Sequence, residues 1–180
     1  MNRTVSRVGR VAGVAAVAAG LTLAMSMPAS AQQPTDTIVN KNSNLCLEIG
    51  GWSTEWGAAA NQWSCGAGGQ ANQQWLTNGN YPSGWFPLVN KNSGQCLEIG
   101  GWSTEWGAGA NQWPCGKDAN GNYTQANQLW RLGGVGDPKY TYLINKNSGL
   151  CLEVGGWNTG NGARVNQWPC GNVQANQLWS

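Results

Sequence analysis

Hydrophobic and polar positions follow one another in short stretches along residues 38–180, and each stretch ends at a turn signal. Residues 38–39 open an apolar run, residues 42–44 (Asn-Ser-Asn) predict a turn, and residues 45–49 alternate with a period of two. Two further strands are predicted over residues 59–65 and 72–77, bounded by glycine-rich breaks. Nothing in residues 32–180 has helical periodicity, so the pattern predicts an all-β fold.

This pattern occurs three times. Residues 39–66 recur at 89–116 and 144–171; the first two copies agree at 24 of 28 positions and the last two at 20 of 28. Each copy is followed by the signature Ala-Asn-Gln-x-Trp, which ends at Trp75, Trp130 and Trp179. Four strands in each of three units predict closure around a pseudo-threefold axis. A solenoid is the competing architecture, and the lack of distinct capping repeats disfavours it.

The six cysteines occupy matching places, two in each repeat and 19 positions apart. Six cysteines allow 15 connectivities, and the symmetry favours pairing within each repeat, since any other scheme would treat equivalent units differently. Each bridge closes a loop of about 20 residues and should contribute roughly 3 kcal/mol. The alternative, thiolate metal binding, is disfavoured because the chain has no Cys-x-x-Cys spacing and no histidine. We therefore expect no metal, no cofactor and the disulfides Cys46–Cys65, Cys96–Cys115 and Cys151–Cys170.

Residues 1–31 have the pattern of a secretory signal peptide. Three arginines precede an apolar stretch over residues 11–27, and Ala29-Ser30-Ala31 is typical of a cleavage site. The alternative, a membrane-spanning helix, is disfavoured by the small-residue ending. We expect a secreted, extracellular protein without membrane insertion after cleavage. The predicted domains are an N-terminal extension over 32–36 and one domain over 37–180, with repeats at about 37–77, 88–132 and 143–180.

Charge and composition narrow the function classes. Three of the ten basic residues and none of the eight acidic residues lie in the signal, so residues 32–180 carry seven basic and eight acidic side chains. A near-neutral chain is a poor partner for nucleic acid. The absence of histidine removes the usual imidazole base of hydrolases. All 12 tryptophans lie outside the signal, which indicates a function that needs aromatic faces.

The repeated motifs Cys-Leu-Glu-Ile/Val, Asn-Gln-Trp-x-Cys and Asn-Gln-x-Trp resemble the ricin B-type lectin family over about residues 37–180. The resemblance implies a β-trefoil that binds mono-, oligo- or polysaccharides and glycoconjugates. It implies one shallow pocket per repeat, built from an acidic residue after the first cysteine, an aromatic residue before the second, and the asparagine of the last motif. By motif these residues are Glu48, Trp63 and Asn72; Glu98, Trp113 and Asn127; Glu153, Trp168 and Asn176. A polar residue of each aromatic segment also resembles a family contact: Asn61, Asn111 and Asn166.

The chemistry of these side chains suits a sugar. A carboxylate accepts from adjacent hydroxyls, an amide both donates and accepts, and an indole face packs on C–H groups. Each residue type also has an ordinary structural role: Glu as a solvated strand residue, Trp as core, Asn as a turn residue. Pattern and resemblance together place Trp75, Trp130 and Trp179 in the core. The family more often has Asp where this chain has Glu, so the resemblance does not imply a galactose preference.

Further tryptophans are expected on loops. Trp52, Trp102 and Trp157 follow Gly-Gly pairs, Trp56 and Trp106 precede a glycine, and ligand contact is the usual reason for aromatic residues on loops. The third repeat has Gly160-Asn161 where the first has Glu55-Trp56, from which we expect a weaker or differently selective third site.

Two other functions compete with sugar binding. A glycosidase needs two carboxylates close together, and each repeat has only one carboxylate common to all three, so no enzyme activity is expected. A trefoil acting through protein contacts, as a protease inhibitor or toxin subunit, is the remaining alternative, because fold alone does not exclude it.

Overall fold

A computed structural model describes Met1, residues 35–77, Tyr81 and residues 83–180. The chain divides into Met1–Ala31 and Gln32–Ser180. The predicted signal peptide, apart from Met1, and residues 32–34 of the predicted extension lie outside the described residues.

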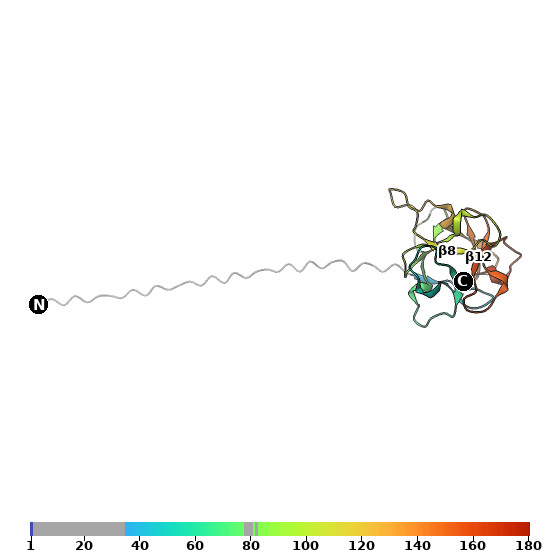
Figure 1. Ribbon diagram of the computed structural model, residues 1–180, viewed down its shortest axis with the longest axis horizontal. Coiled ribbons are helices and arrows are strands. Elements are labelled where there is room, and N and C mark those ends of the chain that lie inside the picture. The colour runs from blue at the N-terminus through green and yellow to red at the C-terminus, as the bar shows by residue number, and fades with distance from the viewer. Residues whose placement is uncertain (2–34, 78–80, 82) are drawn as a thin grey trace. The chain divides into compact units, whose positions relative to one another are not determined.

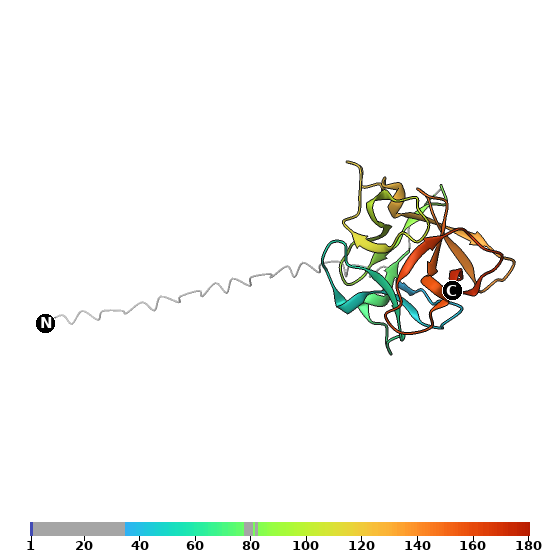
Figure 2. The ribbon, with the colours of Figure 1, turned by 45° about the vertical axis from the view of Figure 1, so that its right-hand side comes forward.

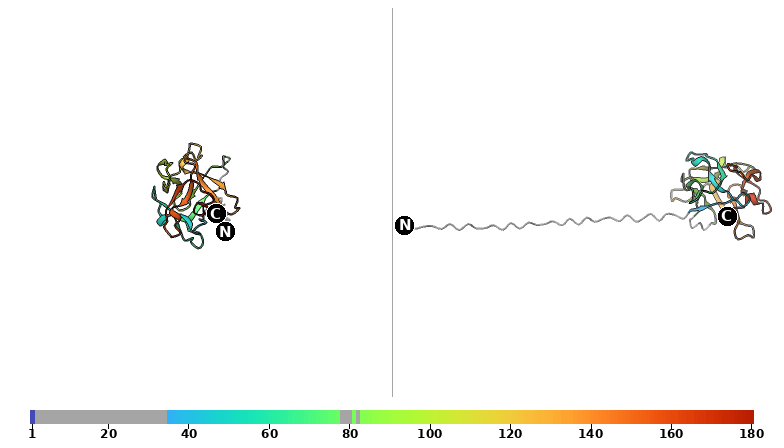
Figure 3. Two further views of the ribbon diagram at one scale, coloured as in Figure 1. Left: turned by 90° about the vertical axis from the view of Figure 1, so that its right-hand side faces the viewer. Right: turned by 90° about the horizontal axis from the view of Figure 1, so that it is seen from below.

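The described residues of the second unit form short strands joined by loops and single-turn 3-10 helices, with no α-helix among them (Figure 3). The strands are β1 (Thr35–Thr37), β2 (Cys46–Ile49), β3 (Ala60–Trp63), β4 (Gln74–Leu76), β5 (Phe86–Pro87), β6 (Val89–Asn90), β7 (Cys96–Ile99), β8 (Ala110–Trp113), β9 (Leu129–Gly134), β10 (Thr141–Asn145), β11 (Cys151–Val154) and β12 (Val165–Trp168). The 3-10 helices are η1 (Gly50–Trp52), η2 (Ala71–Gln73), η3 (Gly100–Trp102), η4 (Ala126–Gln128), η5 (Gly155–Trp157) and η6 (Ala175–Gln177).

Six chain segments close into a barrel. Strand β4 lies between β1 and β6, and β9 lies between β5 and β10. Strands β5 and β6 are parts of one segment, residues 86–90, which joins the two sets of strands. The C-terminal segment closes the ring, because Trp179 bridges both Thr141 and Asn40. Thr35 and Asp36 belong to β1, where they pair with Leu76 and Trp75.

Three hairpins, β2–β3, β7–β8 and β11–β12, cover one end of the barrel. Their second strands meet around the pseudo-threefold axis, where Gly109 bridges Asn166 and further bridges join the other two pairs. Figure 1 shows β8 and β12 side by side near the middle of the domain. The repeats occupy separate sectors, as the colours of Figure 2 show. The predicted β-trefoil, all-β with three repeats, is confirmed.

The core confirms the assignment of the last tryptophan of each repeat. Trp75, Trp130 and Trp179 are fully buried, and each indole N–H donates to a backbone carbonyl of its own repeat, at 3.0–3.1 Å. Leucines and isoleucines of β2 and β7 and their counterparts in β11 pack around them. The three predicted disulfides are formed, each with 5.1 Å between the Cα atoms. Burying the indole N–H together with its acceptor avoids the cost of an unpaired polar group.

One strand prediction was wrong. Residues 72–77 were expected to be strand, but Asn72 and Gln73 lie in η2 and only residues 74–76 continue as β4. Both side chains turn back to hydrogen-bond the first hairpin, which the straight course of a strand would not allow. The same departure recurs in η4 and η6.

Candidate functional site

Each hairpin brings one carboxylate opposite one amide. In the strand registers Glu48 pairs with Asn61, Glu98 with Asn111, and Glu153 with Asn166. The 3-10 helix that follows supplies the third polar group of each site, at Asn72, Asn127 and Asn176. We call these groupings site 1, site 2 and site 3, by the repeat that holds the carboxylate.

The carboxylates are buried rather than solvated. Only 4–6% of Glu48, Glu98 and Glu153 is exposed. In site 2, Oε2 of Glu98 accepts from Nδ2 of Asn127 at 3.1 Å and from Nε2 of Gln128 at 3.0 Å. The same two bonds recur in the other sites at 3.0–3.2 Å. These amides also donate to backbone carbonyls, so the asparagine and glutamine fix the carboxylate in place.

Burial changes the acidity of these groups. Desolvation raises the pKa of the Glu98 carboxyl above its ordinary value, and the hydrogen bonds from Gln128 and Asn127 offset part of the rise. The pKa values of Glu48 and Glu153 are raised for the same reason. When ionised, each of these carboxylates gains from any donor able to replace its lost hydration.

Each site also holds acceptors that no described residue serves. The hydrogen bonds among the described residues fall on Oε2 of each glutamate, which leaves Oε1 without a donor from them. Six of the seven buried amide oxygens that lack a donor within the described part of the chain belong to the three sites: Oδ1 of Asn61, Asn72, Asn111, Asn127, Asn166 and Asn176. Because buried acceptors are normally paired, this threefold repetition points to a hydroxyl-bearing ligand or water.

The expected aromatic platforms are on the surface. Trp63, Trp113 and Trp168 end β3, β8 and β12 and are 41–45% exposed. Their alternative role as core residues is ruled out by this exposure, in contrast to the buried Trp75.

In site 2 these groups line one cavity of about 330 Å³. Four of the predicted residues take part, Glu98, Asn111, Trp113 and Asn127, together with Gly101, Trp102 and Gln125. The last three were absent from the predicted site set. The Gly-Gly-Trp sequence was the available signal for two of them, since it had already placed Trp102 on a loop.

The Gly-Gly-Trp turn shapes this wall. A Cβ atom on Gly100 would lie 2.6 Å from Nδ2 of Asn111, so only glycine lets that amide approach. Trp102 has φ +56°, and Trp52 and Trp157 have φ +56° and +55°. A bulky residue in the left-handed region costs about 1–2 kcal/mol, and such strain is concentrated at functional positions.

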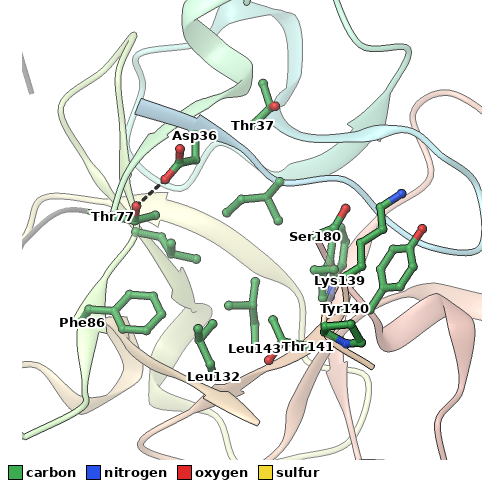
Figure 4. Close-up of a pocket in the computed structure, with 14 residues that line it drawn as sticks. Asp36, Thr37, Thr77, Phe86, Leu132, Lys139, Tyr140, Thr141, Leu143 and Ser180 are labelled. Atoms are coloured by element: carbon green, nitrogen blue, oxygen red, sulfur yellow. Dashed lines mark hydrogen bonds between the residues drawn. The ribbon is translucent and has the colours of Figure 1, made fainter. Parts of the chain in front are cut away.

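A larger cavity of about 510 Å³ lies elsewhere, where β1, β5, β9 and β10 surround the barrel mouth away from the hairpins. Figure 4 shows its mainly apolar wall, with Phe86, Leu132 and Leu143, and the hydrogen bond from Thr77 to Asp36. None of the twelve predicted sugar-site residues lines it. We therefore assign the candidate function to the three repeated sites rather than to the larger hollow.

Two other structural findings concern the described residues alone. No cluster of three or more His, Cys, Asp or Glu side chains that could hold a metal ion occurs among them. Among the same residues no helix is long and apolar enough to cross a membrane.

Fold and site define a β-trefoil with three repeated surface sites. The profile of the ricin-type β-trefoil lectin domain matches residues 84–180, and that of the ricin-type β-trefoil lectin domain-like group matches residues 26–113. The chain belongs to the ricin-type β-trefoil lectin domain family. No curated protein matches it in sequence.

Solved structures agree. A designed threefold symmetric protein, ThreeFoil, is 33% identical with a TM-score of 0.70, over 79% of this chain and 94% of that chain. An exo-β-1,3-galactanase from Clostridium thermocellum is 28% identical with a TM-score of 0.70, over 83% of this chain but only 30% of the galactanase. A ricin B-like lectin from Macrolepiota procera, solved with lactose, is 17% identical with a TM-score of 0.64, over 84% and 96% of the two chains, and shows the fold alone.

Proposed function

We propose that the protein is a non-enzymatic lectin that binds glycans at the three repeated sites. One observation carries the proposal: all three sites hold a buried carboxylate fixed by two amides, beside unserved acceptors and an exposed indole. Sugar hydroxyls are donors that suit the acceptors, and the C–H face of a sugar ring suits the indole. Membership of the ricin-type β-trefoil lectin domain family supports the same function.

The structure sharpens the role of each group. Both N–H groups of Asn127 are used within the protein, one on Glu98 and one on the carbonyl of Ile99. Toward a ligand this asparagine can only accept, and it can do so only after a small shift, because its oxygen is covered. The acceptor left for a ligand is therefore the second carboxylate oxygen, and Trp113 and Trp102 both line the same cavity.

Export belongs to the same proposal. The signal-like residues 1–31 and the three disulfides support a protein that acts outside the cytoplasm. N-terminal sequencing of the protein recovered from the culture medium tests this, with Gln32 expected as the first residue.

A glycan array tests the binding proposal, with wild type compared against Glu48→Gln/Glu98→Gln/Glu153→Gln. Glutamine keeps an oxygen at the position of Oε2, so the amides that now serve the carboxylate keep an acceptor and the fold should persist. The control, Asp118→Asn/Asp137→Asn, removes charge from exposed loops outside the three sites. We expect specific binding by wild type and control and its loss in the triple variant. No binding by wild type to any glycan would refute the proposal and favour a protein partner.

A further inference from the structure

The loop that follows each Gly-Gly-Trp turn is fastened to the next repeat rather than to its own. Nε2 of Gln112 donates to the carbonyls of Ser53 and Glu55 at 3.0 and 2.9 Å, and the N–H of Gly57 donates to the carbonyl of Gln112 at 2.8 Å. Gln167 holds the second loop in the same way, and Gln62 holds the third. Each site therefore borders a loop from the preceding repeat.

In sites 2 and 3 this loop brings an indole of the preceding repeat against the indole that ends the hairpin. Trp56 lies against Trp113 with ring centroids 5.7 Å apart and an angle of 54° between the planes. Trp106 lies against Trp168 at 5.7 Å and 53°. Residues of different repeats thus form one continuous aromatic surface at each of these two sites.

Site 1 is built differently. The equivalent loop residue is Asn161, whose Oδ1 accepts from the backbone N–H of Ser64 at 2.9 Å and from its hydroxyl at 3.1 Å. Sites 2 and 3 have Pro114 and Pro169 where site 1 has Ser64. Proline has no N–H that could donate to an asparagine. Asparagine in the loop therefore occurs together with serine in the hairpin at site 1, and tryptophan in the loop occurs together with proline in the hairpin at sites 2 and 3.

This arrangement places the loop difference of the third repeat at another site than the sequence predicts. Gly160-Asn161 belongs to the third repeat, and the expected consequence was a weaker or differently selective third site. The loop instead borders Trp63, and a Cβ on Gly162 would lie 3.6 Å from that ring. Site 1 is therefore the site whose bordering loop carries no indole.

The added indoles are not there to fill the core. Trp56 and Trp106 remain 67% and 65% exposed, and Trp113 is 41% exposed, close to the 45% of the unpaired Trp63. Trp56 does not line the cavity of site 2, so it extends the aromatic surface beyond that cavity. The Trp56 ring, whose centroid lies 5.7 Å from that of Trp113 and whose plane is tilted to it, is placed to meet the next unit of a chain whose rings are not coplanar.

We propose that sites 2 and 3 each bind two consecutive units of an oligosaccharide, the first at the carboxylate and Trp113 or Trp168, the second at Trp56 or Trp106. Site 1 binds a single unit. The proposal rests on the glycan-binding function proposed above and adds the ligand class, a chain of at least two sugars with twisted linkages.

The test uses full-length folded protein with one working site at a time. Glu48→Gln/Glu153→Gln leaves site 2, and Glu98→Gln/Glu153→Gln leaves site 1. An array carries galactose, N-acetylgalactosamine, glucose, mannose and xylose, each as the monosaccharide and as the disaccharide. It identifies the sugar that wild type binds best, and the monosaccharide and disaccharide of that sugar are then compared. Isothermal titration calorimetry then measures the ratio of disaccharide to monosaccharide affinity for each variant. One further aromatic contact predicts a ratio of about threefold to tenfold at site 2 and a ratio near one at site 1.

Substitutions in the bordering loop test whether its indole causes the preference for the disaccharide. In the site 2 variant, Trp56→Ala should bring the ratio to about one, whereas Leu132→Ala, which removes an exposed apolar side chain outside the sites, should not change it. In the site 1 variant, Asn161→Trp/Ser64→Pro should create the preference. Equal affinities at site 2 that Trp56→Ala leaves unchanged would overturn this inference and leave the lectin function standing. Failure of wild type to bind any sugar of the array would instead overturn the proposed function, and this inference with it.

Discussion

Removal of the buried carboxylate of site 2 should affect stability and binding separately, depending on what replaces it. Glu98→Ala deprives Nδ2 of Asn127 and Nε2 of Gln128 of one acceptor each, whereas Glu98→Gln keeps an oxygen within reach of both. An orphaned buried donor costs about 1–3 kcal/mol. The cavity admits water here, so the lower end applies and the two variants should differ by about 2 kcal/mol. For a domain of this size that corresponds to a difference of about 4–8 °C in Tm.

Removing the charge of Glu98 has the opposite effect on stability from removing the acceptor that it provides. Because burial raises the folded-state pKa of Glu98, the protonated form is favoured on folding. The associated stability is fully present below the unfolded pKa and is lost as the pH rises through the folded pKa. Wherever it is ionised, the carboxylate therefore carries a net desolvation cost, which Glu98→Gln removes. We expect the Tm of Glu98→Gln to equal or exceed that of wild type at pH 7, and this advantage to shrink as the pH falls toward 4.5.

Differential scanning calorimetry at pH 4.5 and pH 7 measures both effects, and sugar affinity should fall in both variants. Glu105 offers the matched control, because it is an exposed glutamate of the same repeat. The free energies of unfolding of Glu105→Ala and Glu105→Gln should differ by no more than about 0.5 kcal/mol. Equal stability of Glu98→Ala and Glu98→Gln would show that the carboxylate does not serve these amides and would refute the reasoning.

Four shorter predictions follow from the same geometry. Sugar affinity measured by calorimetry should decline on acidification at a higher pH than an ordinary glutamate would give, because the pKa values of the three carboxyls are raised; affinity constant down to pH 4.5 would contradict this. Cys96→Ala/Cys115→Ala should lose about 3 kcal/mol, seen as a lower midpoint in urea, and an unchanged midpoint would contradict it. The free energy of unfolding of Trp102→Gly should exceed that of Trp102→Ala by about 1 kcal/mol, and both variants should bind sugar more weakly than wild type. Equal free energies of unfolding would show that the backbone at φ +56° is not strained. Wild type should agglutinate glycan-bearing cells and Glu48→Gln/Glu98→Gln should not, since crosslinking needs more than one site; agglutination by the double variant would disprove the assignment.

Repetition made the fold predictable from sequence. Equivalent cysteines 19 positions apart predicted the disulfides, and period-two alternation puts Leu47 and Ile49, both core residues, on one face of a strand. The alternation does not show that the other face of β2 is buried too. The 3-10 helix η2 covers Glu48 with Asn72 and Gln73, and a pattern of single-residue polarity cannot show that a polar face will be covered by polar side chains.

Contacts between repeats could not be predicted in the same way. Trp56 and Trp113 are far apart in sequence, and their meeting depends on which hairpin follows which around the axis. Local pattern therefore assigned the Gly160-Asn161 difference to its own repeat. The ring of hairpins transfers it to site 1.

The two parts of each site are consequently under different constraints. The carboxylate, its two amides and the platform indole are the same in all three repeats, and their hydrogen bonds also tie each hairpin to its 3-10 helix. The bordering loop makes the same backbone contacts everywhere, whether it carries Trp56, Trp106 or Asn161. A substitution there leaves the fold intact and changes only the exposed surface beside the carboxylate. Ligand length and selectivity can therefore differ from site to site on one symmetric scaffold, whereas a substitution that takes the acceptor away from the two amides lowers stability.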